Sequence, residues 1–179
     1  GGPTGGRDQS FPTLLLSAWV PGGQGVLFPE GTGIQVVPGT VLALQIHYNT
    51  TAITNQQDQT TLQFQLEPTV AHRAVYAPWL DLNWVLGDMT IPAGQSRVEH
   101  GVRDDPRWFF EMFASDFDLS AGFDIHATLF HMHQLGVSGH VKLVRSDGSE
   151  QDILKISQWD FNWQREYQLM RPIRFEPGD

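Results

Sequence analysis

The sequence predicts an all-β protein, an antiparallel jelly-roll-like β-sandwich that forms part of a two-domain arrangement. Three observations favour this class. The chain contains 18 Gly and 11 Pro residues, which suit many turns better than long helices. Short apolar runs alternate with turn signals at intervals of roughly 8–12 residues, which is typical of sandwiches. A hydrophobic content of 40% is enough for a packed core.

The first half of the chain contains two clear strand patterns. Residues 11–40 alternate short apolar runs with Pro-Gly turns. In residues 41–48, VLALQIHY, the large apolar side chains share one face and His47 lies on the opposite, polar face. Residues 60–68 alternate in the same way, and the polar segment 49–59 is expected to be a loop.

The second half predicts further strands. Residues 104–118 fit either a short helix or an aromatic-rich strand. Strands are then expected in 123–136, 139–161 and 167–179, with a hairpin turn at the SDGS of 146–149. The chain stops at a turn that normally leads into another strand, so we expect the natural sequence to continue.

Composition excludes several classes of function. The net charge is −9 with only 11 Lys and Arg residues, which argues against nucleic acid and against a basic membrane-surface patch. No apolar run approaches the roughly 20 residues that span a bilayer. Because the chain has no cysteine, any metal must be held by His, Met, Asp or Glu.

The segment FHMHQLG, residues 130–136, holds the strongest candidate site. On a regular strand, His131 and His133 lie on one face, about 6.5–7 Å apart, so their rings can converge on one ion. His126 and Met132 fall on the opposite face. Imidazole is a natural anchor for copper or zinc. The alternative is that this short pattern is fortuitous and the two are core or surface histidines.

The other histidines are weaker candidates. His47 is a lone histidine on a polar strand face, and it is either a ligand or a half-exposed strand residue. His140 lies on the next predicted strand and could approach the pair. His72 and His100 occur in turn-rich sequence, so we expect them to be solvated.

Several segments, in this order and spacing, resemble the copper type II, ascorbate-dependent monooxygenases. That family includes peptidylglycine α-hydroxylating monooxygenase and dopamine β-monooxygenase. The resemblance covers nearly the whole chain. Its segments are WVPGGQGVLFPEGTGIQV (19–36), LALQIHYNT (42–50), HMHQLG (131–136), WDFNWQREYQL (159–169) and FEPGD (175–179).

The resemblance implies a division of the chain and a set of ligands. Residues 1–68 match the C-terminal part of a first copper domain, and 69–179 match most of a second, truncated at its C-terminus. His131 and His133 match two ligands of the oxygen-activating copper, and His47 matches one ligand of the electron-transfer copper. The remaining methionine and two histidines are expected outside this chain, so the resemblance implies that the chain alone is inactive.

The resemblance also implies the reaction. One oxygen atom of O2 enters a C–H bond of a small organic or peptide-like substrate, and ascorbate supplies the electrons. The protein is expected to be extracellular or periplasmic, and the missing cysteines suggest a bacterial-type member. Each ligating ring needs a hydrogen bond to its second nitrogen. Asp160, Asn162 and Gln164 are polar residues of this region, but the sequence assigns none of them as that partner, and it favours a strand–turn segment in which Trp159, Phe161 and Trp163 pack. The alternatives are a zinc-loaded site and a non-catalytic metal-binding or interaction module.

Overall fold

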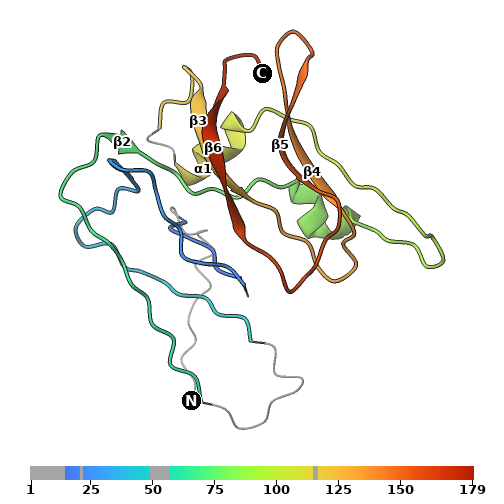
Figure 1. Cartoon of the computed structure of the whole chain (residues 1–179), viewed down its shortest axis with the longest axis horizontal. Coiled ribbons are helices and arrows are strands. Elements are labelled where there is room, and N and C mark those ends of the chain that lie inside the picture. Colours follow the sequence, from blue (N-terminus) through green and yellow to red (C-terminus); the bar gives the residue numbers. More distant parts are fainter. Residues whose placement is uncertain (1–14, 21, 49–56, 115–116) are drawn as a thin grey trace. The chain divides into compact units, whose positions relative to one another are not determined.

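The computed structural model describes residues 15–20, 22–48, 57–114 and 117–179. The chain forms two compact units, one of Gly1–Leu27 with Val75–Asp179 and the other of Phe28–Ala74. Strands predominate and the helices are few and short, which confirms a mainly β protein (Figure 1). Across the described residues the antiparallel sheets are two-stranded, and they form neither a closed barrel nor a clear sandwich. The predicted domains 1–68 and 69–179 stay a prediction.

The larger unit contains an antiparallel pair formed by β3 (Phe123–Leu129) and β6 (Glu166–Phe175). The ladder runs from the pair Phe123 and Phe175 to the pair Leu129 and Glu166, with an irregularity between Ile125 and Ala127. The rings of Phe123 and Phe175 stack at 4.9 Å, so the aromatic side chains strengthen the end of the ladder farthest from the histidine pair.

A hairpin follows, formed by β4 (Gly139–Val144) and β5 (Glu150–Ile156). The predicted turn at 146–149 is confirmed, since the Arg145 N–H donates to the Ser149 carbonyl at 2.8 Å. Gly148 adopts φ +83°, a conformation that favours glycine. The SDGS sequence therefore specifies this hairpin locally.

The segment 104–118 contains a helix, α1 (Arg107–Phe113), which settles the two alternatives left by the sequence. Pro106 precedes the helix, a position that suits proline because its missing N–H would have no partner there. Phe109 is buried and contacts Trp79 and Phe113 edge-on or tilted, at 5.8 and 5.3 Å. A short π-helical turn, η1 (Trp84–Asp88), lies upstream.

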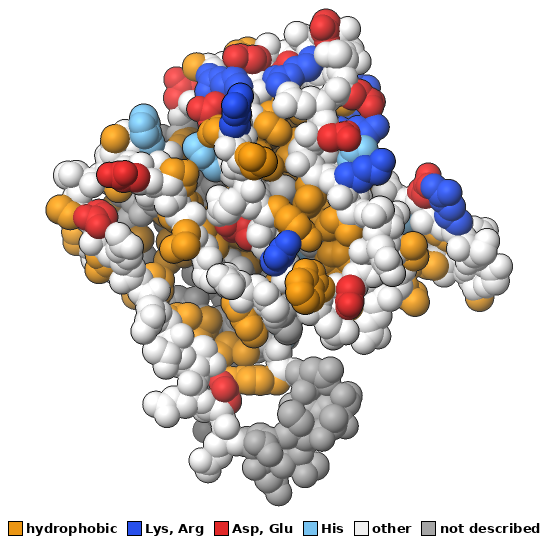
Figure 2. All heavy atoms as spheres, in the orientation of Figure 1, with side chains coloured by type: hydrophobic (Ala, Val, Ile, Leu, Met, Phe, Trp, Pro, Cys, Tyr) orange, Lys and Arg blue, Asp and Glu red, His pale blue; other side chains and the backbone are white. Residues whose placement is uncertain are grey.

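The smaller unit contains a parallel two-residue ladder between β1 (Thr32–Gly33) and β2 (His72–Arg73). The prediction of strands at 41–48 and 60–68 is wrong, because neither segment pairs with another strand. Val41 is 89% exposed and Leu66 is 81% exposed. Apolar side chains also reach the surface on the face drawn in Figure 2. An alternating pattern supplies an apolar face, but a strand also needs a hydrogen-bonding partner.

The strand expected over 123–136 is shorter than predicted. β3 ends at Leu129, which pairs with Glu166, the first residue of β6. The ladder stops there because β6 provides no further backbone partner. His131 and His133 therefore lie after the end of the strand and not on its face.

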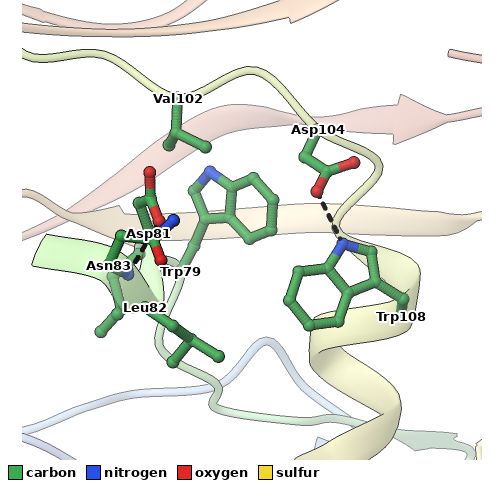
Figure 3. A pocket seen from close by; sticks show the side chains of 8 residues that line it. Trp79, Asp81, Leu82, Asn83, Val102, Asp104 and Trp108 are labelled. Atoms are coloured by element: carbon green, nitrogen blue, oxygen red, sulfur yellow. Dashed lines mark hydrogen bonds between the residues drawn. The ribbon is translucent and has the colours of Figure 1, made fainter. Parts of the chain in front are cut away.

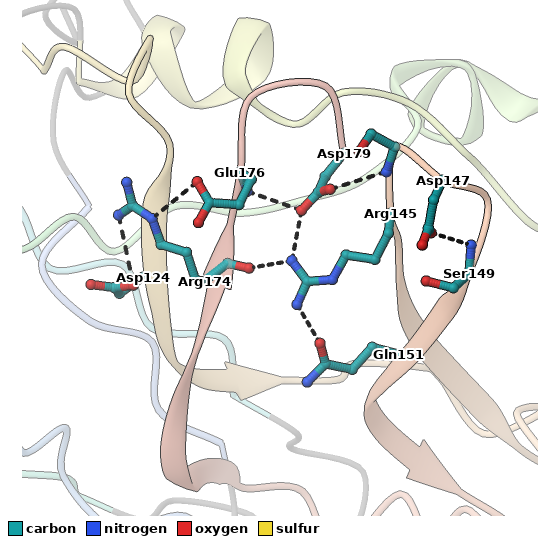
Figure 4. Close-up of polar contacts among 9 residues, drawn as sticks. Asp124, Arg145, Asp147, Ser149, Gln151, Arg174, Glu176 and Asp179 are labelled. Atoms are coloured by element: carbon teal, nitrogen blue, oxygen red, sulfur yellow. Dashed lines mark hydrogen bonds and ion pairs between the residues drawn. The ribbon is translucent and has the colours of Figure 1, made fainter.

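A polar network joins the β4–β5 hairpin to the segment after β6 (Figure 4). The Arg145 guanidinium donates to the Arg174 carbonyl and to the Asp179 carboxylate, both at 2.7 Å. The backbone N–H groups of Ser146 and Glu176 donate to the same carboxylate at 3.1 and 2.9 Å. These contacts hold the two sheets of the larger unit together at one end.

Among the described residues, no helix has both the length and the apolar character needed to cross a bilayer.

Candidate metal centre

The two candidate histidines lie in a short loop between β3 and β4. His131 and His133 are exposed, and a tight turn follows them, in which the Gly136 N–H donates to the His133 carbonyl at 3.0 Å. A second backbone contact holds the segment after this turn, because the backbone N–H of Trp159 donates to the Val137 carbonyl at 2.7 Å. Backbone contacts thus fix the loop although it is not part of a sheet.

The imidazole rings of His131 and His133 lie side by side. Their centroids are 5.1 Å apart and their planes cross at 75°. An ion about 2.0 Å from one nitrogen of each ring would lie about 3.2 Å from each centroid, so two ligating rings at a tetrahedral angle have centroids about 5 Å apart. The spacing of the pair fits a shared metal ion.

A buried amide holds one of the two rings. Gln164 is only 2% exposed, and its Oε1 lies 2.6 Å from Nδ1 of His131. The other end of the amide is also engaged, because Nε2 donates to the Phe161 carbonyl at 2.8 Å. The amide oxygen must therefore face the ring and accept a hydrogen bond from the Nδ1–H group. This leaves the Nε2 lone pair of His131 available for a metal.

Two glycines allow aromatic rings to pack against the loop. A Cβ on Gly136 would lie 2.8 Å from Cβ of Met132 and 2.9 Å from Cδ1 of Trp159. A Cβ on Gly139 would lie 2.4 Å from the Phe130 ring. The rings of Phe130 and Trp159 pack edge to face, with their centroids 6.4 Å apart. The histidine loop is thus fastened by close packing that only glycine permits.

The other histidines are placed differently. His47 lies in the Phe28–Ala74 unit and is exposed, so its predicted role as a ligand stays a prediction. Nε2 of His140 lies 2.7 Å from the Asp152 carboxylate across β4 and β5, and His140 is thus engaged in a surface pair. His126 lies on β3 and is half-buried.

The donor set suits a copper ion, since two neutral imidazoles bind both Cu(I) and Cu(II). Among the described residues, no group of three or more His, Asp or Glu side chains could hold a metal. The pair therefore provides two nitrogen donors, and further coordination positions are open to water or another donor.

The sequence did not identify Gln164, which was one of three polar residues that could not be assigned as a partner, and it gave no sign of the close packing of Gly136 on Trp159. The available signal was an amide directly after Trp163 in FNWQ, which does not specify its distant partner. No family model, curated protein or solved structure matches the chain.

Proposed function

We propose that His131 and His133 bind copper and that the chain belongs to an ascorbate-dependent copper monooxygenase. The observation that carries the proposal is the pair of adjacent imidazoles, one of which is oriented by a buried amide. The resemblance of the flanking segments supplies the reaction class. The same proposal includes a jelly-roll sandwich fold and a location outside the cytoplasm. It also includes a small organic or peptide-like substrate.

In this proposal the residues of the chain have distinct roles. His131 and His133 are the ligands, and Gln164 is a positioning residue that keeps the proton of His131 on Nδ1. Bound copper would supply the one-electron chemistry by which O2 is activated. The exposure of both rings leaves the ion reachable by O2, ascorbate and substrate.

The first experiment measures copper binding by competition with a chelator. We expect His131→Ala and His133→Ala each to weaken binding by more than the roughly 10–100-fold typical for loss of a residue that only orients a ligand. His72→Ala is the matched control, because His72 is exposed on β2 in the other unit. Unchanged affinity in both site variants would refute the site.

The second experiment addresses redox chemistry. The Cu(II) signal in electron paramagnetic resonance should disappear on anaerobic addition of ascorbate and return when O2 is admitted. A site that binds zinc in preference to copper, or copper that stays oxidised, would instead favour a non-catalytic metal-binding module. That alternative has support in the absence of a third His, Asp or Glu ligand among the described residues.

A further inference from the structure

The larger unit contains a second candidate site, which is formed by residues other than those of the histidine loop. A hollow of about 350 Å³ opens between the segment preceding η1 and the N-terminal end of α1. Figure 3 shows the indole rings of Trp79 and Trp108 on either side of it, with the carboxylates of Asp81 and Asp104 nearby. Leu82 contributes an apolar wall. None of these residues has a role in the proposed metal site.

The aromatic walls are held in place by different means. Trp79 contacts Phe109 and Phe110 edge-on at 5.8 and 6.2 Å, so its ring is anchored in the aromatic core. Trp108 donates its indole N–H to Asp104 at 3.0 Å and remains 44% exposed. Two held indole rings border one hollow, and the face of an aromatic ring attracts a cation because it carries negative charge.

The charge of the hollow has one sign. Eight residues line it, and they carry two carboxylates and no Lys or Arg side chain. The Asp104 carboxylate is fixed by Trp108 and by the Asp105 N–H at 2.8 Å, and Asp81 accepts the Asn83 N–H at 2.9 Å. In each of these bonds an N–H group donates to a carboxylate oxygen, so the positions of the carboxylates are set in advance.

We propose that this hollow binds an organic cation, with its ammonium group against the indole rings and near the Asp104 carboxylate. A neutral sugar also stacks on tryptophan and can donate its hydroxyl groups to carboxylates, but it would leave their negative charge without a counter-charge. The proposed site is independent of the histidine pair, and either can fail without affecting the other.

The test titrates the protein with choline and follows the indole N–H resonances by nuclear magnetic resonance. We expect the Trp79 and Trp108 resonances to shift with saturation, with a Kd on the order of millimolar. The neutral carbon isostere of choline, which has the same shape without the charge, should shift them far less. Methyl glucoside should leave them unchanged.

Variants locate the binding. Trp108→Leu and Asp104→Asn should each weaken choline binding by about threefold or more. Trp163→Leu is the control, since Trp163 is an exposed tryptophan that contacts Arg165 elsewhere in the unit. Asp104→Asn keeps the shape of the side chain, so an unchanged spectrum outside the hollow verifies its fold. Equal binding of choline and its isostere, binding of the sugar in its place, or no saturable shift would each overturn the proposal.

Discussion

A single hydrogen bond sets the chemistry of the proposed centre. Gln164 reaches His131 from 33 residues away and accepts a hydrogen bond from Nδ1, so in the neutral ring the lone pair lies on Nε2. Gln164→Leu removes the acceptor at similar volume, so we expect copper affinity to fall by about 10–100-fold. Gln164→Glu keeps an acceptor for Nδ1 but loses the donor to the Phe161 carbonyl, so it should retain more affinity than Gln164→Leu and less than the wild type. Chelator competition measures both, and equal affinities in the wild type and the Leu variant would show that Gln164 does not orient the ligand.

The histidine loop also depends on a glycine. Gly136→Ala would place a methyl group within 2.9 Å of two neighbouring atoms, so the loop or Trp159 must shift. We expect the free energy of unfolding to fall by about 1–3 kcal/mol, the usual cost of overpacking. Gly101→Ala is the control, because no atom lies within 4 Å of the added Cβ. Urea denaturation of the wild type and the two variants measures this difference. Equal midpoints for the two variants would contradict this packing argument.

At the scale of elements, the Asp179 carboxylate links the ends of the β3–β6 and β4–β5 sheets. The Asp179 side chain is 2% exposed, and the backbone N–H of Glu176, aided by Arg145 and the N–H of Ser146, lowers its pKa. A lowered folded-state pKa means that the unfolded chain takes up the proton first as pH falls. The stabilisation is therefore present above about pH 5 and is lost as pH drops through the folded pKa.

Asp179→Asn tests this link. At neutral pH the variant should unfold at a lower urea concentration than the wild type, and this gap should narrow as the pH falls below the ordinary Asp pKa of about 3.9 towards the lowered pKa of the folded state. Asp124→Asn is the control, because the exposed pair of Asp124 with Arg174 spans 3.7 Å and should contribute little. A gap that does not depend on pH would mean that the charge of Asp179 is irrelevant.

The elements also show what the sequence could predict. The SDGS turn and its hairpin are local, and they were predicted correctly. The end of β3 depends on where β6 begins, and the ladder expected at 41–48 depends on a partner strand, so neither follows from an alternating pattern. The histidine pair was evident as a motif, whereas its contacts with Gln164 and Trp159 arise from tertiary packing.

At the scale of the molecule, the two units differ in how much hydrogen-bonded structure they contain. Residues 139–156 form a paired hairpin, whereas the described residues 57–66 are exposed and lie outside any ladder. Amide hydrogen exchange should therefore be slow in the hairpin and fast in 57–66, because exchange reports local opening. Mass spectrometry of peptides from both segments measures this. Equal protection would show that 57–66 is paired in solution.

The central claim is that one copper ion binds both imidazoles of the loop. Pulsed electron paramagnetic resonance counts imidazole ligands through their remote nitrogens, and a His47→Ala background with less than one equivalent of Cu(II) restricts the signal to this site. We predict two equatorial imidazoles in that background and one after His131→Ala or His133→Ala. A count that stays the same in both variants would contradict the claim.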